Sequence, residues 1–272
     1  MISVPEVVVE RIAAAIGRGE TLADLAAAAS RAVGGKGVSA IVAASFSNPD
    51  RFPSLAVRIA ASLGLPASTA AFDLQMACSA YPYALYVAGR LAADTGGSVL
   101  VVDGDVQLPF VDKNDHATGK IFSDACTATL VSANADGESA FSFLSRHDEA
   151  LTCPSAGPIR MDGFKVFSFV ATEVSKFLGD FLAAAPSPDF FAPHQAQPYM
   201  VRQLADALGL KEKLLTIPEK LKNPGSCSVP LALAHNAAKI AGSRALVAGF
   251  GAGYSAAAGI VRVSGDFEGM VL

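Results

Sequence analysis

Cys78 stands at a corner between two predicted elements, where a cysteine can act as a nucleophile. Residues 69–77 are typical of a β-strand, and the Ala-rich residues 79–93 predict a helix. The free N–H groups and the dipole at a helix N-terminus favour the thiolate, the form of cysteine that attacks carbonyl carbons. The alternative interpretation, usual for an isolated cysteine, is a small buried apolar residue.

The other three cysteines have no such setting. The chain contains no CxxC pair, so the sequence predicts neither a disulfide framework nor a metal site. The remaining cysteines are Cys126, Cys153 and Cys227, and each is interpreted as a free, buried residue.

A histidine and an asparagine occupy comparable corners. His194 follows the apolar residues 190–193 and precedes a predicted helix, which places it at the carboxyl edge of a sheet, where α/β proteins form their sites. Asn223 lies in a turn before another Ala-rich helix. Its amide can shape that turn or donate a hydrogen bond to a carbonyl. The alternative interpretation of His194 is a core histidine whose hydrogen bond is satisfied within the protein. The other three histidines, His116, His147 and His235, are interpreted as core histidines of this kind.

Two stretches of the chain resemble each other, which indicates an internal duplication. Residues 53–65 are similar to residues 198–210, at an offset of 145 residues (198 − 53), and each predicts an amphipathic helix entered at a proline. A second similar pair follows in the same order, starting at Cys78 and at Ser226. A twofold relation between the halves would bring the turns of Cys78 and Asn223 to one crevice.

Each half predicts the order strand, helix, strand, helix, strand, which favours parallel sheets covered by helices. No flexible linker separates the halves, so we expect one packed unit, with the first half over residues 1–145 and the second over 146–272. The expected elements are 38–45, 53–63, 69–75, 79–94 and 97–106 in the first half, and 187–192, 198–208, 214–217, 227–241 and 244–249 in the second. Further elements are helices at 6–17, 21–33 and 162–185, and strands at 120–131 and 140–145.

The composition excludes several classes of protein. Hydrophobic residues make up 51% of the chain and charged residues 17%, the opposite of a disordered segment. The net charge of −4 and the lack of a basic stretch argue against a nucleic-acid partner. The uncharged residues 245–261 contain four glycines and predict two strands and a turn rather than a membrane span. Because Glu6 and Glu10 are unlike a signal peptide, we expect a cytoplasmic protein.

The segments that carry the three chemical residues resemble one enzyme family. Residues 71–79 resemble the nucleophile segment of 3-oxoacyl-(acyl carrier protein) synthase III, residues 192–196 resemble its histidine motif, and Asn223 resembles the asparagine of its third motif. Residues 161–167 and 249–253 also resemble segments of that family. Cys, His and Asn in this order are far more specific together than any one of them alone.

This resemblance implies a thiolase-like fold, in which duplicated βαβαβ halves form a layered α/β/α/β/α arrangement, and an acyltransferase of fatty acid or polyketide-like biosynthesis. Cys78 would take an acyl group from a thioester, and a malonyl-type thioester would lose CO₂ and attack the acyl carbonyl. His194 and Asn223 would donate hydrogen bonds to the extender's thioester oxygen, each worth roughly 3–4 kcal/mol. Backbone N–H groups of Cys78 and Ala252 would hold the acyl carbonyl, and Phe250 would shield the departing carboxylate.

The resemblance also implies substrates and partners. No metal and no bound cofactor are expected, because the substrates are thioesters of coenzyme A or of phosphopantetheine on an acyl carrier protein. Tyr81 is a candidate wall of the substrate pocket, with core packing as the alternative. Related enzymes are usually dimers, so we expect a homodimer, or a heteromer with a related subunit, with the sheet edge near residues 97–106 in the interface.

Several positions depart from the family pattern. We expect the chain to begin at the family's first long helix, without the opening strand and without the Trp- and Arg-bearing segment that holds coenzyme A; the chain has no Trp. Tyr199 stands where many relatives have an Arg that docks the carrier, Gln197 replaces Asn, and residues 123–127 replace a glycine-rich stretch. These differences favour a carrier-protein donor, or a site completed by a partner, in a specialised enzyme of secondary metabolism.

Other functions fit parts of the pattern. An acyltransferase of the same fold would pass the acyl group to a non-carbon nucleophile, and a subunit of a heteromeric enzyme would be loaded while its partner shapes the pocket. A Cys-His-Asn hydrolase would need His194 as base to the thiol, which the duplication disfavours. A subunit with a purely structural role would not explain why Cys78, His194 and Asn223 are all present. Residues 251–256 match a dinucleotide-binding fingerprint, but the remaining chain is too short for the βαβ unit that such a site requires.

Overall fold

Strands and helices alternate along the first half of the chain in the predicted order. The computed structural model describes residues 1–272. The elements of the first half are β1 (Ile2–Ile16), α1 (Leu22–Val33), β2 (Val38–Ala44), α2 (Leu55–Ser62), β3 (Ala70–Leu74), α3 (Ala80–Thr95), β4 (Ser98–Asp105) and β5 (Ala125–Asp148).

The second half repeats this order, except that the counterpart of β3 is reduced to a single bridge. A long helix is formed by α4 (Gly163–Phe169), one π-helical turn (Val170–Val174) and α5 (Ser175–Ala184). It is followed by β8 (Phe190–Pro193), α6 (Pro198–Ala207), α7 (Ser228–His235), α8 (Ala237–Ile240), β9 (Arg244–Gly251) and β10 (Gly253–Val271). Two short strands, β6 (Leu151–Thr152) and β7 (Arg160–Met161), pair with each other near the start of this half.

The strand order β3-β2-β4-β5-β1-β10-β9-β8 contains the same arrangement twice. In the first half, β1 pairs antiparallel with β5, and the chain continues through α1 to the parallel strands β2, β3 and β4. In the second, the end of β5 pairs antiparallel with β10, and the chain continues through α4 and α5 to the parallel strands β8 and β9. The duplication inferred from the sequence is therefore present in the sheet.

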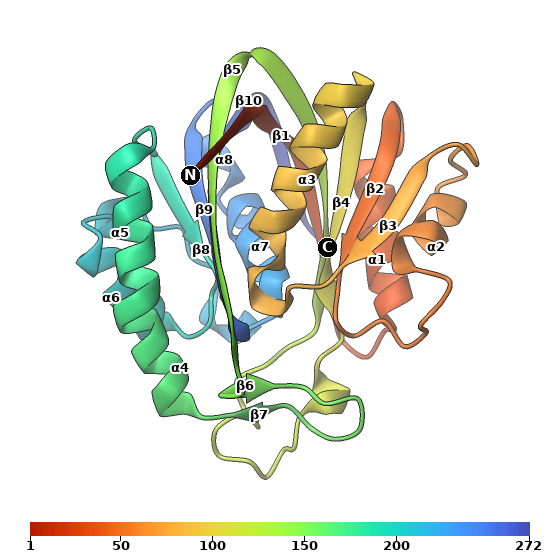
Figure 1. Ribbon diagram of the computed structural model, residues 1–272. Coiled ribbons are helices and arrows are strands. Elements are labelled where there is room, and N and C mark those ends of the chain that lie inside the picture. Colours follow the sequence, from red (N-terminus) through yellow and green to blue (C-terminus); the bar gives the residue numbers. More distant parts are fainter.

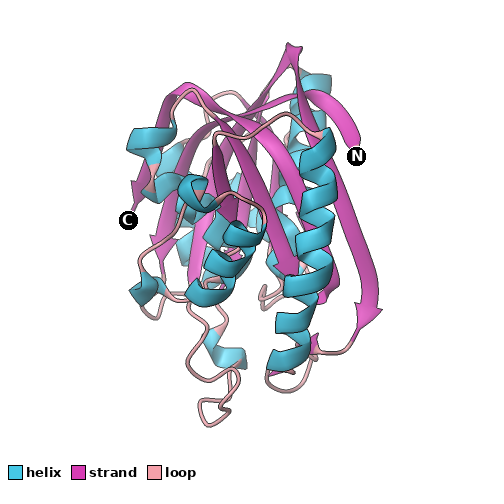
Figure 2. Cartoon of the chain, turned by 90° about the vertical axis from the view of Figure 1, so that its left-hand side faces the viewer, coloured by secondary structure: helices cyan, strands magenta, loops and turns pink.

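The helices form three layers around the strands, which confirms the predicted α/β/α/β/α arrangement. Figure 1 shows α3 and α7 in the middle, α1 and α2 on one side, and α4, α5 and α6 on the other. Figure 2 looks onto the layer of α4, α5 and α6, which lies across the strands. Three separate clusters of buried side chains match these layers: one around α3 and α7, one under α1 and α2, and one under α4 to α6.

The first and third helices of the chain have clear sequence signals at their ends. The hydroxyl of Thr21 accepts the backbone N–H of Asp24, and the Asp24 carboxylate accepts the backbone N–H of Thr21, so both caps of a capping box are present. Helix α3 ends at Gly96, whose φ of 67° is the left-handed conformation that glycine adopts without strain. These caps fix where α1 begins and where α3 passes into β4.

The predicted helix over residues 6–17 is wrong, because these residues form β1. The run Val7–Val9 is β-branched, and β1 lies between β5 and β10, where both of its faces are covered. The Ala-rich residues 13–15 favour a helix in isolation, but in the sheet their small side chains let the covering layers approach closely. The prediction that the chain begins with a helix and lacks a preceding strand is also wrong, because β1 precedes α1.

Other predicted elements differ in extent. The two strands expected at 120–131 and 140–145 are one long strand, β5. The predicted boundary between the two halves, at residues 145/146, falls within this strand and stays a prediction. Residues 214–217 form no strand beyond a single bridge between Leu214 and Phe191. The helix expected at 227–241 is divided at Asn236 into α7 and α8.

The predicted interface edge near residues 97–106 is also wrong. Strand β4 occupies this range and is hydrogen-bonded to β2 on one side and to β5 on the other. The free edge at this end of the sheet belongs to β3, which pairs only with β2. None of the helices combines the length with the hydrophobicity needed to cross a bilayer.

A glycine in α3 determines how closely the central layer approaches β1. A Cβ added to Gly89 would lie 2.4 Å from Cγ2 of the buried Val7. We expect Gly89→Ala to lower the free energy of unfolding by about 1–3 kcal/mol through overpacking, measured by urea denaturation. In a Val7→Ala background the obstructing methyl is gone, so the same change should cost clearly less. Equal costs in both backgrounds would contradict this packing.

Candidate active site

Cys78 lies on a single 3₁₀ turn, Ala77–Ser79, between the end of β3 and the start of α3. Ala77 has a φ of 44°, an uncommon value for a residue with a side chain, and it turns the backbone sharply before the cysteine. The end of β9 packs directly against this turn. A Cβ on Gly249 would lie 2.7 Å from Cα of Ser79, and one on Gly251 would lie 2.9 Å from Cβ of Cys78. Glycines are therefore required where the second half meets the predicted nucleophile.

The environment of Cys78 favours its thiol at neutral pH. Burial raises the pKa of this thiol to about 12, and the charge of Asp105 acts in the same direction. The backbone N–H groups of Ala252 and of Cys78 itself act against this rise. The expectation that the helix N-terminus keeps a thiolate is therefore not supported, because desolvation of the charged form outweighs the nearby N–H groups. These two N–H groups are the ones predicted to hold an acyl carbonyl oxygen.

Two buried carboxyl groups lie on β4 near the cysteine. One oxygen of Asp105 accepts hydrogen bonds from the hydroxyls of Ser45 and Ser47 at 2.7 and 2.9 Å and from two backbone N–H groups. Burial raises the pKa of Asp105 to about 6 in spite of these donors. Burial and the neighbouring Asp105 raise the pKa of Asp103 well above its usual range, which favours a neutral carboxylic acid there.

His194 follows the last residue of β8 and lies against the start of α7. Its backbone N–H donates to the Ala248 carbonyl of β9 at 2.7 Å, which continues the β8–β9 pairing to the site. Its Nδ1 lies 3.1 Å from the Gly225 carbonyl oxygen and 2.9 Å from Ser228 Oγ. Burial lowers the pKa of His194 to about 4, and the Gly225 carbonyl acts in the opposite direction. The imidazole is therefore neutral at pH 7.

Asn223 lies at the corner of the second half that corresponds to the Cys78 corner. Lys222, directly before it, has a φ of 54°; Lys222 and Ala77 are the two residues other than glycine with a positive φ. The Asn223 side-chain oxygen accepts the Gly225 backbone N–H at 2.9 Å. Its amide nitrogen donates to no protein group within hydrogen-bond distance, and the residue is 5% exposed. The N–H₂ group is thus available to a substrate in the cavity.

Cys78, His194 and Asn223 line one cavity of about 280 Å³ between the two halves. Phe250 also lines it, with its ring edge-on to His194 at a centroid distance of 5.6 Å. Most of the remaining lining is apolar: Ile121, Phe122, Leu151, Met161, Val166, Val170 and Met200. The structure thus brings together the three residues singled out from the sequence.

Tyr81 does not line this cavity, so its predicted place at the substrate is wrong. Its side chain is fully buried in the central cluster around α3 and α7, with its hydroxyl 3.2 Å from Thr129 Oγ1. Position 81 lies on the first turn of α3, and there the ring points into the core. The alternative interpretation of Tyr81, core packing, is the one observed.

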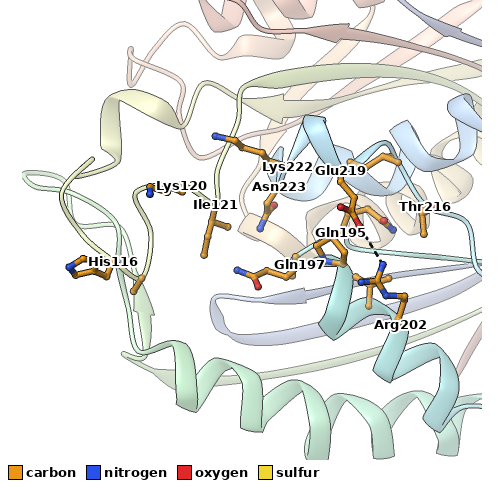
Figure 3. A pocket seen from close by; sticks show the side chains of 15 residues that line it. His116, Lys120, Ile121, Gln195, Gln197, Arg202, Thr216, Glu219, Lys222 and Asn223 are labelled. Carbon is orange, nitrogen blue, oxygen red and sulfur yellow. Dashed lines mark hydrogen bonds and ion pairs between the residues drawn. The ribbon is translucent and has the colours of Figure 1, made fainter.

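A second, more polar cavity of about 500 Å³ adjoins the first and shares Asn223 with it. Figure 3 shows Lys120 and Lys222 on one side of this outer cavity, and the paired Arg202 and Glu219, 3.4 Å apart, on the other. Gln197 lies between the two cavities and lines both. A substrate that reaches Cys78 through the outer cavity passes the Asn223 amide on its way.

A chain of hydroxyls joins the Cys78 turn to the loop that carries Ala252. Ser79 Oγ lies 2.7 Å from Ser255 Oγ, and Ser255 donates to the Ala252 carbonyl at 2.7 Å. Because Cys78 and Ala252 supply the two N–H groups beside the sulfur, this chain holds their relative positions. Sequence patterns gave no signal for these serines, nor for Ser228 beside His194.

A duplicated five-layer fold with its cavity between the halves is the arrangement of the thiolase-fold enzymes, and the comparisons with known proteins agree. Residues 72–148 match the family described as 3-oxoacyl-[acyl-carrier-protein (ACP)] synthase III, and residues 185–263 match its C-terminal part. The curated β-ketoacyl-[acyl-carrier-protein] synthase III 2 of Streptomyces coelicolor is 31% identical over 267 residues, which cover 91% of this chain and 81% of the relative.

Two solved structures illustrate the range of similar folds. A 3-oxoacyl-(acyl-carrier protein) synthase from Burkholderia xenovorans superimposes with a TM-score of 0.91 at 22% identity, covering 100% of this chain and 98% of that one. The priming β-ketosynthase of the R1128 polyketide pathway has a TM-score of 0.80 at 28% identity, covering 91% and 83%. The chain belongs to the 3-oxoacyl-(acyl carrier protein) synthase III family, whose members are acyl-transferring condensing enzymes.

Proposed function

We propose that Cys78, His194 and Asn223 carry out a decarboxylative condensation of an acyl-thioester with a malonyl-type thioester. One observation supports this assignment above all others. Cys78 and Asn223 come from corresponding corners of the two halves, His194 follows the end of β8, and all three side chains line the same largely apolar cavity. Such a cavity excludes water, which would otherwise hydrolyse an acyl-enzyme.

In the first stage, the sulfur of Cys78 attacks the acyl-thioester carbonyl. A new thioester bond forms to Cys78, the bond to the donor's sulfur breaks, and the proton of the Cys78 thiol ends on the departing thiol. The N–H groups of Cys78 and Ala252 donate to the carbonyl oxygen as negative charge develops on it. Because the proton moves from one thiol to another, this stage needs no permanently ionised base.

In the second stage, a malonyl-type thioester loses CO₂ and leaves an enolate whose negative charge lies on the thioester oxygen. His194 and Asn223 donate to that oxygen. The enolate carbon then attacks the acyl-Cys78 carbonyl, a carbon–carbon bond forms, and the Cys78 sulfur leaves and takes up a proton. Two neutral donors suit this step, because breaking the bond to CO₂ generates the carbanion without proton abstraction.

The protonation states of the two residues argue against the hydrolase alternative. A Cys-His-Asn hydrolase uses a thiolate beside an imidazolium. In this site burial raises the pKa of Cys78 to about 12 and lowers that of His194 to about 4, so both groups are neutral at pH 7. Both shifts are opposite in sign to those that an ion pair would produce.

The outer cavity is suited to a phosphopantetheine arm. Lys120 and Lys222 lie at its rim, where an ammonium group can attract a phosphate. Coenzyme A and a carrier protein both present this arm, so the cavity fits either donor. The one aromatic ring among its lining side chains is the imidazole of His116, and no Phe, Tyr or Trp lines the cavity to stack on an adenine ring, which favours the carrier protein.

We also propose that two copies of the chain pair through β3. This strand is the free edge at its end of the sheet, and Phe72 on it is 39% exposed. Pairing of two such edges would extend the sheet across the dimer and cover its open hydrogen-bonding groups. Light scattering of the purified chain tests this arrangement. A monomer at micromolar concentration would contradict it, and a requirement for a related subunit would favour the heteromer.

Intact-mass spectrometry with a panel of acyl-thioesters tests the proposed function. The chain is incubated with acyl groups of increasing length on coenzyme A and on carrier protein, and the adduct is located by peptide mapping. A malonyl thioester is then added, and products are analysed for a 3-oxoacyl group. We expect an adduct at Cys78 and its conversion to a 3-oxoacyl product with release of CO₂.

The same experiment separates the alternatives. An adduct that yields an ester or amide, and no 3-oxoacyl product, would assign the chain to the acyltransferases. Rapid release of free acid would favour the hydrolase. No adduct with any donor in the panel would contradict the role of Cys78.

A further inference from the structure

On the side of the His194 ring that faces α7, the hydrogen bonds around Nδ1 can be assigned group by group. Nδ1 of His194 lies 2.9 Å from Ser228 Oγ and 3.1 Å from the Gly225 carbonyl oxygen. The backbone N–H of Gln195 donates to the same Ser228 oxygen at 3.0 Å. Ser228 is fully buried and His194 is 2% exposed, so water does not complete these bonds.

The hydrogen of the Ser228 hydroxyl has one available acceptor. The Ser228 oxygen already accepts from Gln195, and the only acceptor within hydrogen-bond distance of this hydroxyl is Nδ1 of His194. If Nδ1 carried a proton, the Ser228 hydrogen would be left without a partner inside the protein. An unsatisfied buried polar group costs about 1–3 kcal/mol.

The Gly225 carbonyl does not need a proton from His194. It already accepts the backbone N–H of Ser228 in the turn that starts α7. With Nδ1 unprotonated and Ser228 as its donor, all of these groups are satisfied. With Nδ1 protonated, Gly225 would gain a second donor while Ser228 would lose its only acceptor.

We infer that Ser228 is a positioning residue that holds neutral His194 with its proton on Nε2. Nε2 is on the opposite side of the ring from α7, and His194 lines the inner cavity. The ring then presents a hydrogen-bond donor to the cavity rather than a base. The tautomer itself follows from the hydrogen bonds; its effect on condensation rests on the proposed function.

The tautomer can be read directly from ¹⁵N–¹H correlation spectra of the full chain labelled with [¹⁵N]histidine. The His194 signals are identified by their absence in His194→Gln. In the wild-type chain at neutral pH we expect a protonated Nε2 and an unprotonated Nδ1. In Ser228→Ala the Gly225 carbonyl becomes the only partner of Nδ1, so we expect the proton to move to Nδ1. Ser228→Thr keeps the hydroxyl and should keep the wild-type tautomer.

Ser226→Ala is the matched control, because Ser226 is another buried serine of the same turn whose hydroxyl oxygen accepts from the Tyr81 N–H and does not touch His194. We expect it to leave the His194 tautomer unchanged. A wild-type spectrum with the proton on Nδ1 would overturn the inference, even where Ser228→Ala does not fold. An unchanged tautomer in folded Ser228→Ala would also overturn it.

The kinetic result distinguishes this inference from the proposed function. In Ser228→Ala we expect acyl loading of Cys78 to persist while condensation with a malonyl thioester falls by about 100-fold, the usual effect of losing one preorganised donor. Ser228→Thr should restore most of that rate. If wild type shows the expected tautomer but forms no acyl adduct, the proposed function fails and the tautomer assignment stands.

Discussion

Replacing Cys78 with alanine is expected to abolish the acyl adduct and to lower the condensation rate by more than about 10⁴-fold. Removal of a covalent nucleophile is typically this costly, because neighbouring groups cannot form the intermediate in its place. Intact-mass spectrometry measures the adduct, and product formation from malonyl thioester measures the rate. The fold should survive, because Cys78 is half-buried and alanine leaves its neighbours in place.

Cys153→Ala provides the matched control for this result. Cys153 lies in the segment between β6 and β7 and is exposed, so the prediction that it is buried is wrong. Its loss should leave both the adduct and the rate unchanged. An adduct that persists in Cys78→Ala and disappears in Cys153→Ala would show that Cys153, and not Cys78, is the nucleophile.

Asn223→Asp is expected to lower condensation by about 10²- to 10³-fold while acyl loading of Cys78 is retained. An aspartate keeps the oxygen that accepts the Gly225 N–H, so the turn is preserved. It removes the N–H₂ donor and places negative charge where the enolate oxygen becomes negative. Separate assays of the adduct and of the 3-oxoacyl product distinguish the two stages.

Asn114→Asp, in an exposed loop, adds the same charge away from the inner cavity and should leave both stages unchanged. His194→Ala removes the second donor and should resemble Asn223→Asp, with retained loading and slow condensation. If Asn223→Asp instead abolished loading and left condensation from preloaded chain intact, the assigned role of Asn223 would be wrong.

The site was more predictable from the sequence than parts of the fold. The repeated turn before an Ala-rich helix makes Cys78 and Asn223 candidates, a strand that ends at a polar residue makes His194 one, and the resemblance to a known family joins the three in one site. Those signals are local, so they survive in a single sequence. Ser228 gave no comparable signal, because its importance depends on the hydrogen bonds around Nδ1 of a residue 34 positions earlier in the chain.

The errors came from positions where tertiary context outweighs local preference. Residues 13–15 favour a helix by composition, yet the place of β1 between two strands makes them part of a sheet. Tyr81 is close to Cys78 in sequence, but the turn of α3 directs its ring into the core. The neutral thiol of Cys78 likewise depends on burial and on Asp105, neither of which the helix N-terminus reveals.

The place of β1 in the sheet has a consequence for synthesis of the chain on the ribosome. Val8 of β1 pairs beside Arg262 of β10, so one neighbour of β1 is a strand made 254 residues (262 − 8) later. At ordinary rates of translation, β1 waits roughly 10–50 s for that neighbour. During this time one edge of an apolar strand is open to other nascent chains. The charges of Glu6, Glu10 and Arg11 interrupt that edge and so oppose aggregation until β10 has been made.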